Sequence, residues 1–332
     1  MIALIRKKPA EISKDGSFKR QMNQFTTPFG SKVNELPVEP KRYRLIWSPA
    51  CPWAHRAVIV RRILGLEDVI SLGTTSPIRP NIERVDWEFA LDEHGVDPVL
   101  GITYLSEIYK HTDHQYDGRP TVPVIVDLKK RKVVNNDYFK LTNYFETVWK
   151  PYHKENSPDL YPEHLRGDIE HMNDVIFQDI NNGVYKCGFA QSQEAYEEAY
   201  DALFHRLDQL EGRLSKQRYL FGDYITDSDV RLYTTLVRFD IAYFTAFYAN
   251  RNLIREYHHL WDYVRDLYQT PGFGDTTDFN AIKRHYHLSI TLSPHKEQLK
   301  VLPKGPDLSG WNTAHGRERL SKKEEKFLFT GR

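Results

Sequence analysis

The stretch "RYRLIWSPACPWAHRAVIVRRILG", residues 42–65, predicts a strand followed directly by a helix. Residues 42–47, "RYRLIW", are a strand candidate, and the helix is entered through Pro52, a favoured first helical residue. Gly65 is typical of the position just beyond a helix end. Cys51 precedes Pro52, so its sulfur is expected at the helix N-terminus, where unsatisfied N–H groups lower the pKa of a thiol. The alternative is a buried structural cysteine.

The elements predicted around this stretch alternate in type. They are a strand at 42–47, a helix at 51–65, a strand at 69–73, a helix at 104–112, two strands within 121–136 and a helix at about 137–149. The order β-α-β-α-β-β-α is typical of a thioredoxin-like layer, which we assign to residues 41–150. Residues 1–40 are polar and rich in proline, and are expected to form an extended lead-in.

A second region, after residue 150, has a different character. Three prolines mark a linker at 151–162, and long helical periodicity follows it. Apolar residues form one stripe of a helix at 194–214: Tyr196, Tyr200, Leu203, Leu207, Leu210 and Leu214. Thr226, three residues before Asp229, predicts a capping box with Asp in the usual position of Glu. We therefore expect an all-helical domain at 163–310, followed by a tail at 311–332.

Composition narrows the class of protein. The formal net charge is +1 and the basic runs are short, which disfavours nucleic acid as a partner. No segment approaches the roughly 18 to 20 apolar residues of a spanning helix, and no signal peptide opens the chain. We therefore expect a cytoplasmic protein that has no membrane partner. The two cysteines cannot build a disulfide framework and have no partners at metal-ligand spacing, so no metal is expected.

The neighbours of Cys51 predict how its sulfur works. A C-x-x-C redox motif would place a second cysteine where the chain has Ala54, so Cys51 is expected to form a mixed disulfide that an external thiol resolves. In the segment "TVPV", Pro123 can hold a cis bond that turns the backbone of Val122 outward. A peptide-like thiol can pair with that backbone as an added strand. Cys187 lacks such a context and is expected to be a packing residue.

Six motifs lie between about residues 40 and 310: "CPWAHR" (51–56), "GRPTVPV" (118–124), "NNGVYKCGFAQSQEAYEEA" (181–199), "YLFGDYITDSDVRLYTTLVRFD" (219–240), "LWDYVRDLYQTPG" (260–272) and "IKRHYH" (282–287). In combination they resemble the glutathionyl-hydroquinone reductases, the Xi class of the glutathione transferases. The resemblance implies a thioredoxin-like domain followed by an all-helical glutathione-transferase domain, in a homodimer. It also implies an activity: glutathione, as co-substrate, reduces a glutathionyl-hydroquinone to the free hydroquinone and glutathione disulfide.

The resemblance further assigns roles to individual residues. Cys51 would attack the sulfur of the conjugate and release the aromatic ring, and a second thiol would then attack the mixed disulfide. Trp87 would pack on the tripeptide, Arg119 would hold its carboxylate and Val122 would pair with its backbone. Three tyrosines would line the aromatic pocket and protonate the departing phenolate: Tyr185, Tyr243 and Tyr286.

Two places depart from the family pattern. Where the family has Glu-Ser to grip the γ-glutamyl end of glutathione, this chain has Asp137 and Tyr138. Tyr138 cannot replace a small hydroxyl side chain without rearrangement. The segment 287–308 is also altered, and we expect this to affect the dimer edge or the pocket rim.

Three other functions therefore stay open. The first is the same chemistry with a different low-molecular-weight thiol, for which Tyr138 is the reason. The second is a non-enzymatic ligand-binding or regulatory protein on the same scaffold, because fold does not determine function. A conjugating transferase comes last, because that reaction activates its thiol with a hydroxyl group and this chain has Cys51 at that place.

Overall fold

A four-stranded sheet forms the N-terminal part of the protein in the computed structural model, which describes residues 11–79, 85–289 and 301–329. Its strands are β1 (Tyr43–Trp47), β2 (Ile70–Thr74), β3 (Val124–Asp127) and β4 (Lys132–Asn135), in the spatial order β2-β1-β3-β4. The pair β1–β2 is parallel, whereas β1–β3 and β3–β4 are antiparallel. This mixed sheet, with β1 buried along its whole length, confirms the predicted thioredoxin-like layer.

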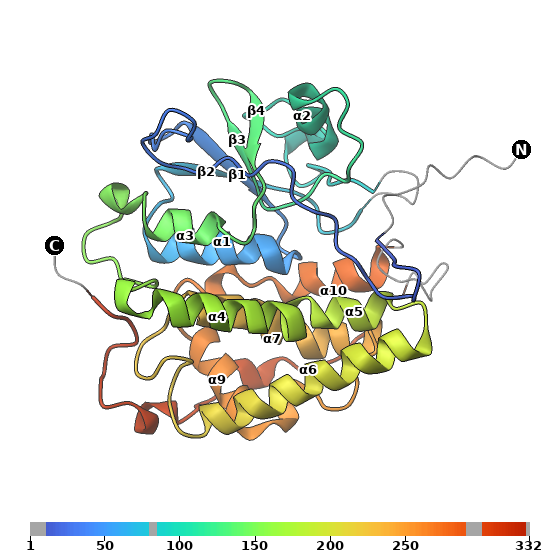
Figure 1. Ribbon diagram of the computed structural model, residues 1–332, viewed down its shortest axis with the longest axis vertical. Coiled ribbons are helices and arrows are strands. Elements are labelled where there is room, and N and C mark those ends of the chain that lie inside the picture. Colours follow the sequence, from blue (N-terminus) through green and yellow to red (C-terminus); the bar gives the residue numbers. More distant parts are fainter. Residues whose placement is uncertain (1–10, 80–84, 290–300, 330–332) are drawn as a thin grey trace, which may run out of the picture.

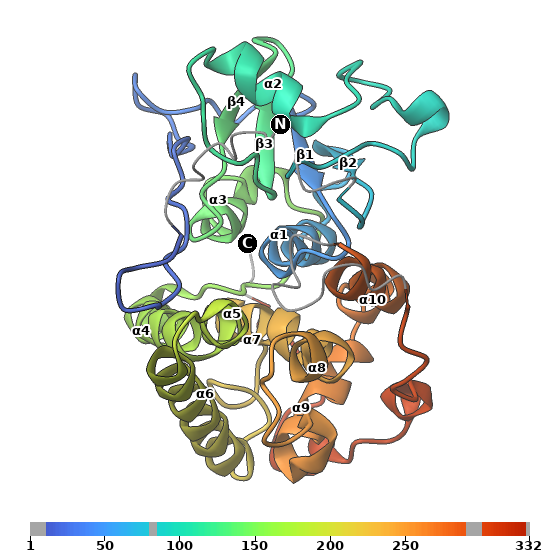
Figure 2. The same cartoon turned by 90° about the vertical axis from the view of Figure 1, so that its right-hand side faces the viewer.

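Three helices flank the sheet: α1 (Pro52–Ile63), α2 (Leu105–Thr112) and α3 (Leu141–Glu146). Figures 1 and 2 show α1 and α3 between the sheet and the helical layer, with α2 on the other side. Every residue of α1 except Arg62 is buried, because the helix is covered by the sheet on one side and by the helical layer on the other. The prediction of a helix over 137–149 was too long, since α3 begins only at Leu141 and ends at Glu146.

The second layer is helical throughout. It contains α4 (Arg166–Ile176), α5 (Gly183–Phe189), α6 (Gln193–Leu214), α7 (Asp227–Arg238), α8 (Phe244–Ala246), α9 (His258–Tyr268) and α10 (Phe279–Leu288). Two π-helical turns, Phe177–Asn181 and Phe239–Tyr243, precede α5 and α8. Short 3₁₀ helices occur along the whole described chain, from the connection between β2 and α2 to the C-terminal segment. They lie at Glu93–Gly95, Lys150–Tyr152, Glu163–Leu165, Ile254–Glu256, Gly274–Thr276, Ser309–Asn312 and Arg317–Leu320.

The helical layer is centred on α7. All twelve residues of α7 are buried, and its N-terminus has the predicted capping box, in which the Thr226 N–H donates to the Asp229 carboxylate at 2.8 Å. The predicted stripe of α6 faces this core through its four leucines, whereas Tyr196 and Tyr200 are only half-buried. The predicted linker 151–162 lies between α3 and α4, and the domain limits themselves stay a prediction.

The described part of the lead-in, residues 11–40, packs against both layers. The dark blue segment in Figures 1 and 2 runs from the helical layer, beside α5, to the sheet. The Gln191 N–H donates to the Gly16 carbonyl at 2.9 Å, and Thr26 forms a β-bridge with Asn135 at the end of β4. The described part of residues 1–40 thus joins the two layers across their common edge.

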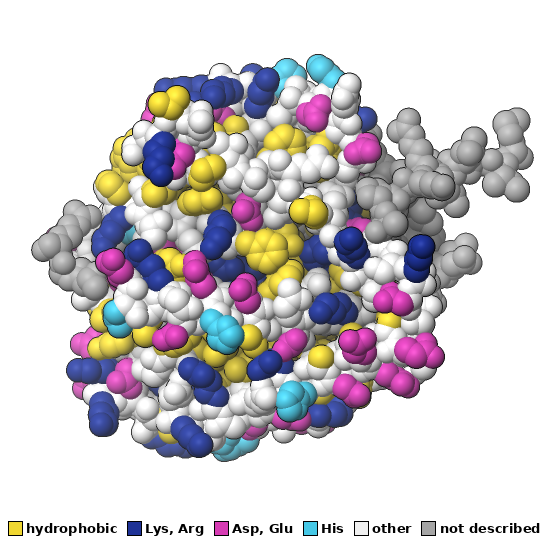
Figure 3. All heavy atoms as spheres, in the orientation of Figure 1, with side chains coloured by type: hydrophobic (Ala, Val, Ile, Leu, Met, Phe, Trp, Pro, Cys, Tyr) yellow, Lys and Arg dark blue, Asp and Glu magenta, His cyan; other side chains and the backbone are white. Residues whose placement is uncertain are grey.

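The surface and the C-terminal segment complete the fold. On the face drawn in Figure 3, basic and acidic side chains are interspersed without a large area of one sign. In the C-terminal segment, Trp311 and Arg317 are buried against the helical layer.

No helix among the described residues is long and apolar enough to cross a membrane. Much of the altered segment 287–308 lies outside the described residues, so its expected effect on the dimer edge stays a prediction.

Candidate active site

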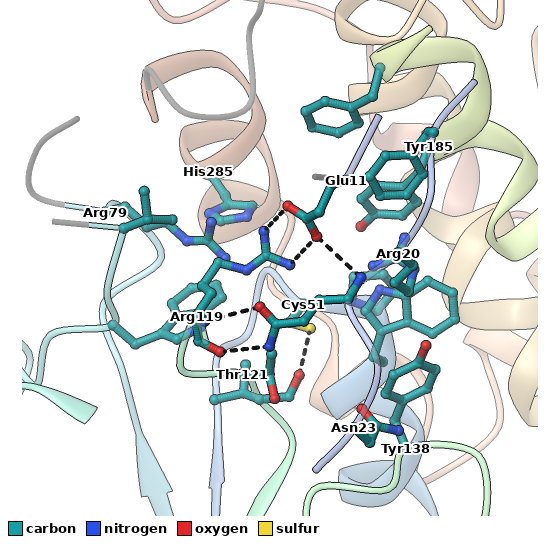
Figure 4. Close-up of a pocket in the computed structure, with 18 of the residues that line it drawn as sticks. Glu11, Arg20, Asn23, Cys51, Arg79, Arg119, Thr121, Tyr138, Tyr185 and His285 are labelled. Atoms are coloured by element: carbon teal, nitrogen blue, oxygen red, sulfur yellow. Dashed lines mark hydrogen bonds and ion pairs between the residues drawn. The ribbon is translucent and has the colours of Figure 1, made fainter. Parts of the chain in front are cut away.

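A cavity of about 400 Å³ lies between the two layers, where the lead-in crosses them. Its walls come from the lead-in, the start of α1, the loop before β3, α5 and α10 (Figure 4). The lining residues are Glu11, Ile12, Phe18, Arg20, Gln21, Asn23, Cys51, Pro52, Trp53, Arg79, Val85, Trp87, Arg119, Thr121, Val122, Tyr138, Tyr185, Phe189, Gln191, His285 and Tyr286. Seven of the nine predicted site residues are among them; Asp137 and Tyr243 are not.

Cys51 lies at the centre of this cavity. It is the N-cap residue of α1, with φ −79° and ψ 118°, directly before Pro52 as the sequence predicts. Its thiol donates to the Val122 carbonyl, with 3.4 Å between Sγ and O. The Val122–Pro123 peptide bond is cis, which confirms that prediction. Two segments that are distant in the sequence, Cys51–Pro52 and Val122–Pro123, therefore lie together and form the surroundings of the thiol.

The predicted lowering of the Cys51 pKa was wrong. Burial raises the pKa of the thiol, and this effect outweighs the opposite effects of the Ala54 and Trp53 N–H groups and of Arg238 and Arg79. The N–H groups at the helix start act in the expected direction. However, the side chain is only 7% exposed, and a thiolate there would lose its hydration.

His55 and Arg56, which follow Cys51 on α1, make their hydrogen bonds with groups other than its sulfur. Arg238 of α7 donates to His55 Nδ1 at 3.1 Å, and His55 Nε2 lies 2.9 Å from the Thr276 hydroxyl. Burial and Arg238 hold the pKa of His55 well below its usual value, so this ring is neutral. Arg56 donates to Asn181 at 2.7 Å and lies 4.7 Å from the Trp53 ring.

Arg238 also holds the loop that carries Cys51. Its guanidinium donates to the carbonyl groups of Pro49 and Ala50, both at 3.0 Å. These bonds connect α7 to the residues just before α1, so the helical layer positions Cys51 of the sheet layer. No motif in the sequence indicated this contact, which spans nearly 190 positions.

Arg119 and Trp87 lie on one side of Cys51, and both have protein partners. Arg119 forms a two-pronged ion pair with Glu11 of the lead-in, at 2.9 and 3.1 Å. Trp87 is 3% exposed, and its ring is stacked on His285 at 5.3 Å with the Arg79 guanidinium 4.5 Å away. Burial lowers the pKa of His285 to about 3, so this partner is neutral.

The lead-in also binds the backbone of Arg119. The Gln21 side chain accepts from the Arg119 N–H at 2.9 Å and donates to the Arg119 carbonyl at 3.1 Å. Glu11 and Gln21 therefore fix Arg119 through both its side chain and its main chain. Sequence reasoning missed both residues, because the predicted lead-in contained no motif and lies about a hundred positions from Arg119.

Aromatic groups form the other side of the cavity. The Tyr185 and Tyr286 hydroxyls are 2.7 Å apart, and the Tyr286 and Tyr243 hydroxyls are 3.1 Å apart. Tyr185 and Tyr286 line the cavity, whereas Tyr243 is fully buried behind them. Burial raises the pKa of all three, so the chain of hydroxyls is protonated and can donate.

The Asp137–Tyr138 pair has two different surroundings. The Asp137 carboxylate accepts from the Phe139 N–H at 3.0 Å, outside the cavity wall. The Tyr138 ring lines the cavity and packs 4.9 Å from Trp53 and 4.5 Å from Phe139. The aromatic side chain thus fills space that a small side chain would leave open.

Other candidate centres are not supported by the structure. Cys187 is buried outside the cavity, where burial raises its pKa to about 12, in line with its predicted packing role. Within residues 11–79, 85–289 and 301–329, no three His, Cys, Asp or Glu side chains are grouped so as to hold a metal ion.

Comparison with known proteins identifies the family. Residues 193–266 match the model of the glutathione S-transferase C-terminal domain. The glutathionyl-hydroquinone reductase YqjG of Escherichia coli is 38% identical over 292 residues, which are 85% of this chain and 88% of the relative. The structure of that relative with glutathione bound has a TM-score of 0.79 at 37% identity, over 92% of this chain and 98% of the other.

Two further solved structures are similar over most of their length. A glutathione transferase from Gordonia bronchialis is 49% identical with a TM-score of 0.83, covering 89% of this chain and 90% of that one. A Xi-class glutathione transferase from Natrialba magadii is 36% identical with a TM-score of 0.83, covering 92% and 96%. This chain belongs to the glutathionyl-hydroquinone reductase family, the Xi class of the glutathione transferases.

Proposed function

We propose that this protein uses Cys51 to cleave the C–S bond of glutathionyl-hydroquinone-type conjugates. Membership of the family makes the chain a glutathione-dependent enzyme rather than a non-enzymatic binding protein. The observation that supports the reaction best is the position of Cys51, at a helix start and against the cis Val122–Pro123 bond, inside a cavity with an aromatic wall.

The reaction has two steps. The Cys51 thiolate attacks the sulfur of the conjugate, so that an S–S bond forms and the S–aryl bond breaks. The electron pair of the S–aryl bond leaves with the ring, which takes up a proton and departs as hydroquinone. A second thiolate then attacks the mixed disulfide, which regenerates Cys51 and releases glutathione disulfide. One conjugate and one glutathione thus become hydroquinone and glutathione disulfide.

The surroundings of Cys51 support an external thiol for the second step. Ala54 stands where a dithiol enzyme has its resolving cysteine, and Cys187 lies outside the cavity. A sulfur nucleophile also separates this reaction from conjugation, in which a hydroxyl group activates the incoming thiol. A cysteine at position 51 therefore favours reduction of a glutathione conjugate over transfer of glutathione to a new substrate.

The two sides of the cavity suit the two halves of the conjugate. On one side, Trp87 and Arg119 are suited to the tripeptide and its carboxylate, and the Val122 N–H donates to no acceptor among the described residues. On the other side, the Tyr185 and Tyr286 hydroxyls can bond the ring oxygens and protonate the departing phenolate. Cys51 lies between them, where the sulfur of the conjugate would be.

A second hypothesis keeps the chemistry and changes the thiol. It is favoured by Tyr138, whose ring takes the place of the small side chain expected at the γ-glutamyl end of glutathione. Oδ1 of Asp137 already accepts hydrogen bonds from the Phe139 N–H and the Asn23 side chain. A thiol without a free γ-glutamyl group would lose nothing from these changes.

The experiment is an assay of the purified protein with a glutathionyl-hydroquinone, with intact mass recorded when the thiol is limiting. We expect an adduct of one thiol on Cys51 and release of hydroquinone. Absence of the adduct together with full activity of Cys51→Ala would sink the mechanism. An adduct that glutathione cannot discharge, but another thiol can, would establish the second hypothesis.

The homodimer, the cytoplasmic location and the domain limits at 41–150 and 163–310 belong to the same proposal. The oligomeric state can be measured by light scattering coupled to size-exclusion chromatography. A monomer at micromolar concentration would contradict the homodimer and leave the Cys51 chemistry untouched.

A further inference from the structure

Arg20 of the lead-in places a positive charge within the aromatic side of the cavity. Its guanidinium carbon lies 4.6 Å from the centre of the Trp53 ring and 4.5 Å from that of Tyr185. In Figure 4, Arg20, Tyr185 and Tyr138 lie on one side of Cys51, opposite Arg119, Arg79 and His285. The charge therefore stands beside Tyr185, which is assigned to the aryl group, and on the same side as Tyr138, at the γ-glutamyl end, whereas Arg119 lies on the opposite side.

The guanidinium of Arg20 is fixed in place but incompletely bonded. Its Nε donates to the Asn182 side chain at 2.8 Å, which anchors the group to the helical layer. Its Nη2 is buried and has no hydrogen-bond partner within residues 11–79, 85–289 and 301–329. A buried N–H donor without an acceptor is costly, so Arg20 Nη2 is short of an acceptor, as is Nε of Arg79 on the other side of the cavity.

The charges of the cavity point to the kind of acceptor that is missing. Among the lining residues that the structure describes, three are arginines, Arg20, Arg79 and Arg119, and one, Glu11, is acidic. Glu11 is already paired with Arg119 through both of its oxygens. Hydrogen bonds from guanidinium to an anionic oxygen are about twice as strong as neutral ones, so an anion satisfies Nη2 better than a neutral group does.

We propose that Arg20 binds an anionic oxygen on the aryl half of the conjugate, which makes it a specificity residue for the reaction proposed above. The oxygen has two possible sources. One is a permanent ring substituent such as a carboxylate. The other is the ring oxygen itself, which is negative when the ring departs as a phenolate.

Equilibrium binding tests the first source without requiring turnover. The probes are 2,5-dihydroxybenzoate and 1,4-dihydroxybenzene, which differ only in a carboxylate, titrated calorimetrically into the full-length protein. We expect the carboxylate compound to bind at least about tenfold more tightly, the value of one charge-assisted hydrogen bond. Arg20→Met should remove this difference and Arg20→Lys should keep most of it.

Steady-state kinetics test the second source. If the wild-type protein binds both probes equally, and Arg20→Met lowers kcat on an unsubstituted glutathionyl-hydroquinone while its KM is unchanged, the ring oxygen is the partner. If the probes bind equally and kcat is also unchanged, the proposal is overturned. It is also overturned if Arg20→Lys is as impaired as Arg20→Met, because charge then has no role.

The matched control is Arg166→Met. Arg166 also lies over a tyrosine ring, Tyr161 at 5.1 Å, and its Nε donates to a carbonyl, but it is outside the cavity. It should change neither probe binding nor kcat. Failure of the proposed reaction would show as absent turnover in the wild-type protein, whereas failure of the Arg20 proposal would show in probe binding, so the two are distinguishable.

Discussion

The two sides of the cavity around Cys51 differ in how their polar groups are satisfied. On the tripeptide side, Arg119 already has the carboxylate of Glu11, so a ligand carboxylate must replace a partner that the protein supplies. On the aromatic side, the tyrosine hydroxyls bond one another and Arg20 Nη2 has no partner among the described residues, so a ligand can add a bond. We therefore expect a ligand to compete with Glu11 at Arg119 and to make a new contact at Arg20.

The largest effect is expected for substitution of Cys51, which lies between the two sides of the cavity. Cys51→Ala should lower hydroquinone release at least about a thousandfold, because the covalent intermediate is lost. Cys187→Ala is the control, since Cys187 is buried outside the cavity, and it should retain activity. Substantial turnover by Cys51→Ala would mean that the external thiol reacts directly with the conjugate, without a mixed disulfide on Cys51.

The second largest effect concerns the pH dependence of Cys51. Burial raises its pKa above the ordinary value of 9.0, and only the thiolate reacts, so the thiolate fraction increases with pH throughout the range below that value. Alkylation by iodoacetamide, followed by intact mass, should therefore accelerate about tenfold per pH unit between about pH 7 and 9. A plateau at neutral pH would show that the helix N-terminus outweighs burial.

Tyr286→Phe tests the aromatic side. Loss of the hydroxyl should lower kcat about tenfold, because the departing ring loses a proton donor, and should leave the KM for the thiol unchanged. Tyr243→Phe removes the next hydroxyl of the same chain, outside the cavity, and should have the smaller effect. If Tyr286→Phe and Tyr243→Phe lower kcat equally, or if the KM for the thiol rises as much as kcat falls, the Tyr286 hydroxyl does not act on the aryl group alone.

Glu11→Gln tests the competition on the tripeptide side and has the smallest expected effect. Gln keeps the shape of the side chain but is uncharged, so a ligand carboxylate should displace it from Arg119 more easily. The KM for the thiol should fall about threefold with kcat unchanged, a modest effect because the ion pair is partly exposed. Glu197→Gln, an exposed change on α6, is the control. An unchanged or higher KM would show that Glu11 does not compete.

Short-range features of the site could be predicted from the sequence. The helix start at Cys51–Pro52, the cis bond before Pro123 and the capping box at Thr226 each depend on residues within four positions. Local chemistry alone determines such features. The helix predicted over 137–149 was too long because α3 begins only after the turn in which Asp137 accepts the Phe139 N–H.

Long-range features could not be predicted in this way. Glu11, Arg20 and Arg238 act on partners 108, 162 and nearly 190 positions away. Glu11 and Arg20 belong to no motif, and Arg238 lies in the motif at 219–240, which does not indicate its contact with residues 49 and 50. The pKa of Cys51 is another feature that could not be predicted from neighbouring residues. It depends on how completely both layers and the lead-in exclude water, which no local pattern encodes.

Local sequence was enough to predict the order of the elements in the sheet layer, the place of Cys51 at a helix N-terminus and the absence of a second cysteine at C-x-x-C spacing, because each depends on neighbouring residues. The surroundings of Cys51 depend instead on how distant parts of the chain pack. The tertiary structure brought the lead-in across the cavity, gave Arg119 a partner from Glu11 and placed Arg20 among the aromatic rings. The physical reason is that burial and charge pairing arise when distant segments pack together.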